Sequence, residues 1–279
     1  MVRKRLIALC VSEEERSKRF GVGFVNLLTW SVLGLLVVAS FGSMLIFYAV
    51  VWLFRVLFAE FQVRRVQALG TAISEKQFPE IDQALQEVCD RFGLTDKPRV
   101  IIINDSQLNA FAMSFAKRRV VVLLSETVEG ILESPEELRF VIGHEIGHHL
   151  FDFSFRGYFE LYKSAAYKAA RELSCDNIGH VGSGSVAKSK QMIKRLAVGN
   201  VLHPRLDEQY LVEESGYLYS GFSGWLLKQY FTYPTVGKRL ANVDRFAQRL
   251  KEFRKRNSEP ETADEVFVDT TSTERQYSS

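Results

Sequence analysis

A chain of 279 residues, 47% of them hydrophobic and 25% charged, has enough apolar side chains to bury a full core, which excludes disorder throughout. Its formal net charge of +3 comes from 36 Lys and Arg against 33 Asp and Glu without a dominant basic block, so no nucleic acid partner is expected. The three cysteines, Cys10, Cys89 and Cys175, are far apart and form no paired motif, which favours a reducing compartment.

The first predicted element is a membrane anchor. Between Arg19 and Arg55 the chain has no charged residue and is apolar almost throughout, as expected for a segment in lipid. The segment is too long for the core of a signal peptide, so we expect it to be retained. We therefore assign residues 1–19 to a basic N-terminal tail and residues 20–61 to a transmembrane anchor.

The anchor is longer than one span requires. Its 35 uncharged residues would extend roughly 50 Å as one helix, against a hydrocarbon core of about 30 Å. Two helices, about residues 21–39 and 42–59 with a turn at 40–43, fit better than the alternative of one tilted span. A hairpin places both basic flanks, and the rest of the chain, on the cytoplasmic side of a bacterial-type inner membrane, whereas a single span would place the rest on the opposite side.

The chain from residue 65 to 255 predicts one folded domain. Apolar residues at helical spacing predict a helix over residues 78–92 that ends at Gly93. Short strands are predicted over residues 99–103 and 119–124. Between them a polar turn leads into a small apolar run.

The second half of this domain is predicted to be helical. Ser134 followed by Pro135 predicts the start of a helix that runs through residue 150. Two more helices are expected over residues 159–177 and 186–198. The stretch GHVGSGS at residues 179–185, which includes His180, predicts a flexible joint between them, and the polar residues 256–279 predict a disordered tail.

The stretch VIGHEIGHHL at residues 141–150 carries the candidate chemistry. On a helix, His144 and His148 are one turn apart, so both imidazoles project from one face and can bracket one tetrahedral zinc ion. Glu145 is one position further round the helix and can act on water at the metal without being a ligand. Because this short pattern also arises by chance on amphipathic helices, and because catalytic zinc takes three protein ligands, a third ligand is needed.

Glu172 in RELSCDN, 24 positions after His148 and on a separate predicted helix, is the candidate third ligand. Asp176 follows it by one helical turn and is expected to accept a hydrogen bond from the distal nitrogen of a ligand histidine. The alternative is a solvated helix face paired with Lys168 or Arg171, and the nearby histidine motif favours the metal site. The predicted cofactor is one zinc ion per chain.

HEIGHH followed by ELSCD resembles the gluzincin metallopeptidases, and within them the membrane-bound family that includes the HtpX-like proteases and the CAAX prenyl endopeptidases. The resemblance covers roughly residues 75–250. Three further stretches share it, NAFAM at 109–113, RRVVVLL at 118–124 and YPTVGKRL at 233–240. It implies a zincin-like α+β domain that cleaves peptide bonds, in which His144, His148 and Glu172 bind zinc and Glu145 is the general base and proton shuttle.

The resemblance also implies substrate contacts. Asn109 and the backbone near Ala110 would hold polypeptide substrate as an added strand. Where the family commonly has His before Pro in its C-terminal signature, this chain has Tyr233, which can donate a hydrogen bond to the developing oxyanion. His203, also followed by Pro, is the alternative for that role.

We therefore expect a membrane-anchored zinc endopeptidase that acts on membrane-associated polypeptide near the lipid bilayer, in membrane-protein quality control. Cleavage of prenylated peptides is less expected, because no further apolar span follows the helix with the histidine motif. The alternative from another class is a catalytically weak adaptor or chaperone-like module with the same fold. Tyr233 favours that alternative, and the presence of every other catalytic residue opposes it.

Overall fold

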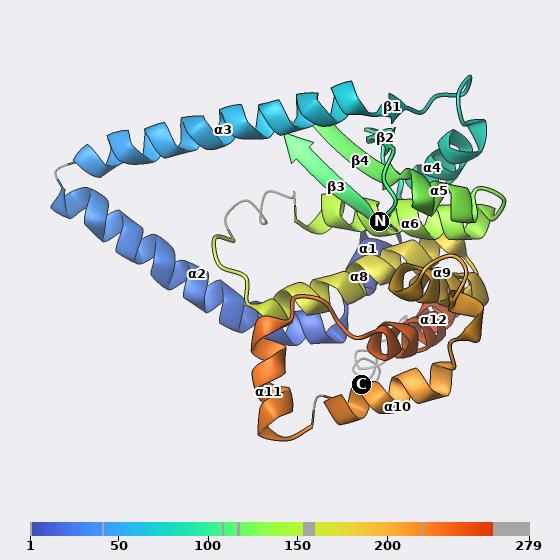
Figure 1. Ribbon diagram of the computed structural model, residues 1–279. Coiled ribbons are helices and arrows are strands. Elements are labelled where there is room, and N and C mark those ends of the chain that lie inside the picture. The colour runs from blue at the N-terminus through green and yellow to red at the C-terminus, as the bar shows by residue number, and fades with distance from the viewer. Residues whose placement is uncertain are drawn as a thin grey trace, which may run out of the picture.

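The computed structural model describes residues 2–40, 42–107, 109–115, 118–152, 160–218 and 220–258. A long helical hairpin extends from a domain in which helices surround a small sheet, which confirms the expected α+β, mostly helical fold class (Figure 1). The helices are α1 (Val2–Cys10), α2 (Glu13–Ala39), α3 (Ser43–Leu69), α4 (Pro79–Phe92), α5 (Ser125–Ile131), α6 (Pro135–Phe151), α8 (Ala165–Ser183), α9 (Val186–Val198), α10 (Glu208–Leu218), α11 (Gly221–Tyr230) and α12 (Val236–Ser258), with a short 3-10 turn, η1, at His203–Arg205. The strands are β1 (Thr71–Ala72), β2 (Arg99–Ile103), β3 (Ala110–Phe115) and β4 (Arg118–Leu124).

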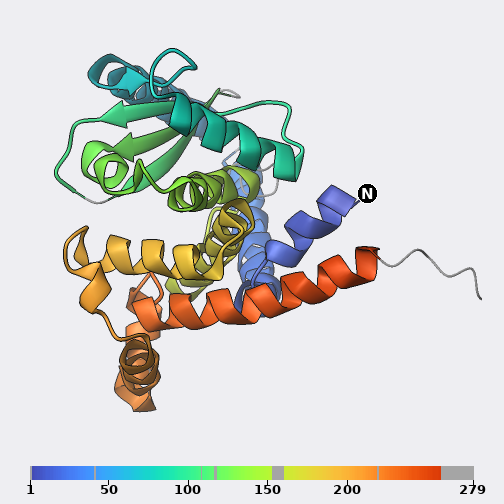
Figure 2. The same ribbon diagram turned by 90° about the vertical axis from the view of Figure 1, so that its right-hand side faces the viewer.

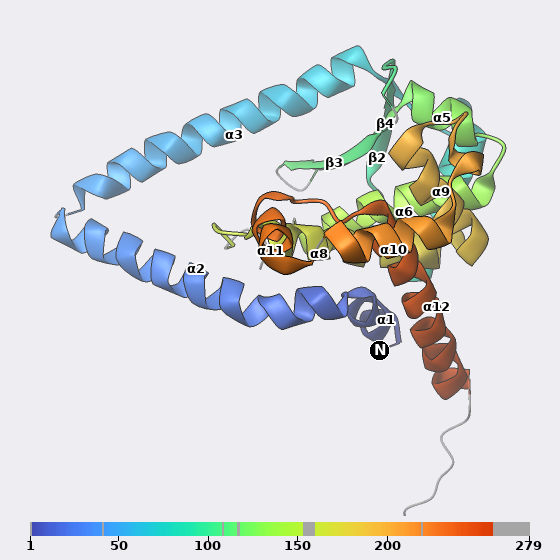
Figure 3. The same ribbon diagram turned by 60° about the horizontal axis from the view of Figure 1, so that its bottom comes forward.

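The predicted anchor folds as two helices. α2 and α3 meet at an apex and diverge from it toward the domain, as Figures 1 and 3 show. Each is long and apolar enough to cross a membrane by length and composition, and most of their large apolar side chains are exposed. The chain therefore takes the hairpin form rather than one long helix. Gly42, with a φ of +83°, begins α3 in a left-handed conformation, and Phe41 lies outside the described residues.

Residues 2–19 differ from the tail that was expected there. α1 and the first turns of α2 are helical, and Cys10, Val11 and Ser12 are buried in the domain. The Ser12 hydroxyl donates to the carbonyl of Ala170 at 2.8 Å, and the Asn177 amide donates to the carbonyl of Cys10 at 2.9 Å. Besides its basic residues, this segment has an apolar face, formed by Leu6, Ile7 and Leu9, that packs on the core.

The sheet has the strand order β1-β2-β4-β3. β2 and β4 are parallel, and β3, formed by the apolar run after the polar turn, pairs antiparallel with β4 at the edge of the sheet. Alternate residues of β4 face opposite sides: Val121 and Leu123 join the main core, whereas Val120, Val122 and Leu124 pack with Val63 near the end of α3. The second hairpin helix therefore continues beyond residue 61 and covers the outer face of the sheet.

α6 and α8 cross at glycines. A Cβ atom on Gly179 would lie 2.7 Å from the carbonyl oxygen of Phe140, and one on Gly182 would lie 2.7 Å from that of Arg139. Residues 179–183 are therefore the last turns of α8 and not the flexible joint that their composition suggested. These glycines permit close helix packing, and only Gly184, with a φ of +75°, and Ser185 separate α8 from α9. His180 is buried, with Nδ1 at 2.9 Å from the Ser189 hydroxyl.

Several predicted boundaries are confirmed. β2 and α9 have the predicted limits, α6 begins at Pro135, and α4 ends before Gly93, whose φ is +63°. α8 begins at Ala165, six residues later than expected, where the Ser164 side chain accepts from the backbone N–H of Tyr167. α12 lies along the other side of α8 and α9 and runs through residue 258 (Figure 2). The remainder of the predicted tail, residues 259–279, lies outside the described residues.

Candidate metal centre

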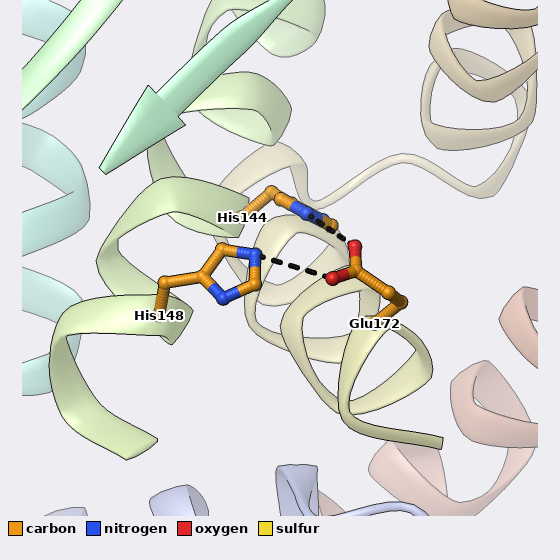
Figure 4. A group of neighbouring side chains, drawn as sticks. All are labelled: His144, His148 and Glu172. Carbon is orange, nitrogen blue, oxygen red and sulfur yellow. Dashed lines mark ion pairs between the residues drawn. The ribbon is translucent and has the colours of Figure 1, made fainter. Parts of the chain in front are cut away.

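The structure brings together the three side chains that the sequence indicated as metal ligands. His144 and His148 project from one face of α6 toward Glu172 on α8 (Figure 4). The Nε2 atom of His144 lies 3.4 Å from one oxygen of Glu172, and the Nε2 atom of His148 lies 3.7 Å from the other. One ligand atom from each of the three residues lies within 4.8 Å of the others, so the group could hold a metal ion.

The distal nitrogen of each histidine is held by a carboxylate. Nδ1 of His144 lies 2.9 Å from an oxygen of Asp176, and Nδ1 of His148 lies 2.9 Å from an oxygen of Asp152. With a proton on each Nδ1, donated to these carboxylates, the Nε2 lone pairs point toward Glu172. Two nitrogen donors and one carboxylate, oriented in this way, suit a divalent metal with a preference for imidazole.

Asp176 is fully buried and has a second, stronger partner in Arg239 of α12. Arg239 donates from Nε to one carboxylate oxygen at 2.8 Å and from Nη2 to the other at 2.6 Å. Burial alone would raise the pKa of Asp176, but the charge and hydrogen bonds of Arg239 and His144 hold it well below its ordinary value. The sequence did not indicate Arg239 as a site residue, although Arg239 lies in the YPTVGKRL stretch, six residues after Tyr233.

Asp152, the partner of His148, was also missed. It lies one helical turn after His148, a spacing that could have indicated it. Its other oxygen accepts from Lys163 Nζ at 2.7 Å and lies 3.5 Å from Arg171 Nη1. Burial opposes ionisation here too, but His148, Arg171 and Lys163 lower the pKa of Asp152 well below its ordinary value.

Glu145 lies beside this cluster and is buried. Its Oε2 atom has no hydrogen-bond partner among the described residues. Burial raises the pKa of its carboxyl, and the nearby histidines oppose that rise. For His144, burial lowers the pKa, but hydrogen bonds with Asp176 and Glu172 raise it to about 10. A buried carboxylate oxygen without a partner, next to a group of metal-type donors, indicates a position built for water or a ligand.

A cleft of about 540 Å³ gives access to these residues. Its lining comes from β3, α6, α8, α9 and α12 and from the residues that precede β3 and α12: Asn109, Ala110, Phe111, Ala112, Phe140, Val141, His144, Glu145, His148, Asp152, Glu172, Leu196, Tyr233 and Arg239. The edge strand β3 therefore forms one wall of the cleft. The side-chain oxygen of Asn109 accepts from the N–H of Ala110 at 2.9 Å. The backbone carbonyl of Asn109 accepts from the Thr127 hydroxyl at 2.9 Å.

Tyr233, and not His203, lines the cleft. Tyr233 is mostly exposed, and the negative charge of Glu172 together with burial raises the pKa of its phenol. His203 is buried in η1, where its Nδ1 lies 2.9 Å from the carbonyl of Asn200. Two other residues near the cluster belong to the core: Cys175 is fully buried under Gly147, and His149 is buried, which lowers its pKa to about 4.

Comparison with known proteins finds a match in the segment that carries β2 to α6. Residues 75–157 match the model of Peptidase family M48. A protein named Protease HtpX homolog from Methanocaldococcus jannaschii is 40% identical over 76 residues, which are 27% of this chain and 26% of the relative. Homologues of the same name from Pediococcus pentosaceus, 38% identical over 81 residues (28% of this chain, 26% of the relative), and Pyrobaculum aerophilum, 40% identical over 73 residues (26% and 20%), also match.

The matched region spans about a quarter of the length of these curated relatives or less. The family match, residues 75–157, includes the histidine motif on α6 and ends before Glu172, Tyr233 and Arg239. No solved structure matches the chain.

Proposed function

We propose that this chain is an HtpX-like member of peptidase family M48 and a membrane-anchored zinc endopeptidase. The observation that carries the proposal is the convergence of His144, His148 and Glu172 from two helices, with a carboxylate on the distal nitrogen of each histidine. Three protein ligands that leave one position open are typical of catalytic zinc rather than structural zinc.

In this proposal His144, His148 and Glu172 hold one zinc ion, and the donor set supports zinc because imidazole and carboxylate without thiolate suit it. Cys175 is buried against Gly147 and is not in the group of residues that could hold a metal. Asp176 and Asp152 fix the tautomer and orientation of the two histidines. Arg239 and Arg171 in turn keep these two carboxylates ionised and in place.

Bound zinc would polarise the scissile carbonyl and acidify a water molecule. Glu145 acts as the base that accepts the proton, since its Oε2 has no other partner among the described residues and its raised pKa makes it a good carrier. It then delivers this proton to the leaving amine. Tyr233, which lines the same cleft, donates its phenol hydrogen to the oxyanion that develops on the substrate carbonyl.

Substrate binds along β3 in this proposal. β3 is at the edge of the sheet and lines the cleft, so its outer backbone groups can pair with an extended polypeptide. Asn109 supports the start of this strand through its hydrogen bond to the N–H of Ala110. Recognition through main-chain groups suits an enzyme that cleaves many unrelated polypeptides.

We further propose that residues 65–255 form the peptidase domain, on the cytoplasmic side of the membrane. The hairpin supports this sidedness because it returns the chain to the side of its basic N-terminal flank, Arg16, Lys18 and Arg19. A domain held at the membrane by two helices has polypeptides of that membrane as its nearest substrates. This favours a role in membrane-protein quality control.

The test is the zinc content of the purified full-length protein by elemental analysis, with casein cleavage measured on the same samples. We expect one zinc per chain, lost with proteolysis in Glu172→Ala and in His148→Ala. Lys168→Ala, an exposed change on α8, is the matched control and keeps both. Absence of zinc from metal-replete wild-type protein would remove the proposal.

Glu145→Gln separates a peptidase from the adaptor alternative. It should retain zinc and lose turnover by about 10²- to 10⁴-fold, since only the proton carrier is removed. A variant that keeps zinc and full casein cleavage would exclude Glu145 as the base. If Glu145→Gln kept the full cellular effect of the wild type, the adaptor function would replace the peptidase. Apart from Tyr233, which lines the cleft, no feature of the described residues favours that alternative.

A further inference from the structure

α11 has its large apolar side chains on the outside. Phe222, Trp225 and Tyr230 are 77%, 54% and 75% exposed, and Leu226 lies on the same helical face. The rings of Phe222 and Trp225 stack with their centroids 5.8 Å apart. Gly224, by contrast, is buried. Among the residues of α11 whose burial is described, the buried one is a glycine and the aromatic side chains face outward, the reverse of a surface helix in water.

This helix lies on the side of the domain that faces the apex of the hairpin. In Figures 1 and 3, α11 packs beside the N-terminal end of α8, in agreement with the contact between the two helices. The segment that leads into α8 is fastened to the hairpin. Asn26 of α2 donates to the carbonyl of Tyr162 at 2.9 Å and accepts from its N–H at 2.9 Å.

The position of Asn26 sets the depth of this contact. It follows Arg19, the last charged residue before the apolar stretch, by seven residues, or roughly 10 Å along the helix axis. The contact therefore fixes one edge of the domain beside a part of α2 that lies within the uncharged segment. Leu161 and Tyr162, on this edge, also have exposed side chains.

From these contacts we propose that α11 is an interfacial helix, embedded in the headgroup region of the same bilayer leaflet that α2 enters. The inference rests on the proposed membrane anchoring and goes beyond it, because it places a second, separate part of the chain in lipid. α11 has ten residues, about 15 Å of helix, which is half of a hydrocarbon core, so it lies along the surface and does not span.

Lipid is the occupant that the chemistry of this surface favours. Trp and Tyr are the residues enriched at membrane interfaces, and the α11 sequence, GFSGWLLKQY, contains no acidic residue. The preceding helix, α10, has Glu208, Glu213 and Glu214, which suit water. The exposed side chains of α11 are apolar and aromatic, like the exposed side chains of α2, such as Phe20 and Phe24.

The position of α11 also determines where the cleft lies relative to the membrane. The segment between α11 and α12 carries Tyr233, and α12 carries Arg239. A helix lying in the bilayer surface therefore holds one rim of the cleft at that surface. The substrates in reach are polypeptide segments that emerge from the bilayer next to the hairpin.

The chain offers a direct test, because its three tryptophans are Trp30, Trp52 and Trp225. Full-length protein with Trp30→Phe and Trp52→Phe retains only Trp225. Both replaced side chains are exposed on the hairpin, so phenylalanine preserves their apolar character without disturbing the core. Each variant is reconstituted in phosphatidylcholine vesicles in which part of the lipid carries a nitroxide quencher, near the headgroup in one set of vesicles and along the acyl chain in another.

We expect Trp225 to lose most of its fluorescence to the lipid nitroxide and to be shielded from iodide in the water. The matched variant, Trp30→Phe with Trp225→Phe, retains only Trp52 and reports whether the hairpin itself is in the bilayer. Quenching of both tryptophans by lipid nitroxide supports the inference.

Three other outcomes overturn it. If lipid quenches Trp52 while iodide quenches Trp225, the hairpin is inserted but α11 is in water. If lipid quenches Trp52 while neither agent quenches Trp225, protein covers α11, either a second copy of the chain or a partner. If nitroxide at no depth in the lipid quenches Trp52, the proposed anchoring fails, and the placement of α11 fails with it.

Discussion

Arg239 on α12 and Asp176 on α8 form a two-pronged ion pair, with Nε and Nη2 of the arginine each donating to a different carboxylate oxygen. The same Asp176 holds Nδ1 of His144 at 2.9 Å. A residue near the C-terminal end of the domain thereby fixes the orientation of the first histidine of the motif. The contact extends the candidate site well beyond the histidine helix.

Replacing this arginine should weaken metal binding. Arg239→Gln leaves Asp176 buried without its main cation, so we expect zinc affinity to fall about 10- to 100-fold by competition with a chelator. Arg245→Gln, an exposed change on the same helix, is the control and should bind zinc like the wild type. Equal affinity in Arg239→Gln and wild type would show that Arg239 does not position His144.

The affinity for zinc should depend on pH through His144. In the metal-free protein its pKa is about 10, because hydrogen bonds with Asp176 and Glu172 outweigh its burial. Zinc must displace this proton, which is bound at all pH values below that pKa. Apparent zinc affinity should therefore rise about tenfold per pH unit from neutral pH and level off near the pKa. Affinity that is flat across this window, after correction for the chelator's own titration, would contradict the pairing.

The glycine contact between α6 and α8 should be sensitive to one added methyl group. Gly179→Ala places a Cβ atom against the carbonyl oxygen and ring of Phe140, and such overpacking costs about 1–3 kcal/mol of unfolding free energy. Gly216→Ala on α10 meets no atom within 4 Å and should raise stability by about 0.5–1 kcal/mol, since alanine favours helix. Thermal unfolding in detergent should show shifts of opposite sign. An unfolding midpoint of Gly179→Ala equal to or above that of the wild type would mean that the close crossing is not required.

Glu15 couples the hairpin to the helix that carries Glu172. Its fully buried carboxylate accepts from the Ser174 hydroxyl at 2.6 Å and pairs with Arg171 at 3.1 Å. Glu15→Gln removes the charge opposite a buried guanidinium, so we expect a loss of about 3–5 kcal/mol of unfolding free energy, read from the unfolding midpoint.

The matched control for this change is Glu13→Gln, in the same helical turn. The Glu13 side chain is 79% exposed, with one carboxylate oxygen 3.5 Å from Arg249, so its replacement should leave the midpoint nearly unchanged. If Glu15→Gln were as stable as Glu13→Gln, the buried Glu15 ion pair would not contribute to the attachment of the hairpin to α8.

Local signals in the sequence predicted many elements correctly. The helical spacing of apolar residues gave α4, Pro135 gave the start of α6, and a short apolar run gave β2. His144, Glu145 and His148 could be selected from their spacing because one turn of helix places them together. Glu172 followed from the need for a third ligand and its position on a second helix. These predictions depend on interactions between residues a few positions apart.

Other features had no such local signal. Residues 2–19 look like a basic tail, and residues 179–185 look like a joint, yet Cys10, Val11, Ser12 and Glu15 are buried in the domain, and so are residues 179–183. The conformation of each stretch depends on what it packs against. α1 packs on α8 and α4, and the glycines allow α8 to approach α6 closely. Composition describes the preference of an isolated segment, and burial against a distant partner overrides it.

The sequence by itself determined the chemistry that the candidate site can offer: two histidines and a carboxylate as ligands, and a neighbouring glutamate. Only the tertiary structure decided which groups from other elements orient them, since Arg171 of α8 reaches Asp152, and Arg239 of α12 reaches Asp176, through ion pairs between separate elements. It also brought Tyr233 to the cleft and left His203 outside it. Residue types set which bonds can form, whereas the folding of distant segments into one core sets which of those bonds are made.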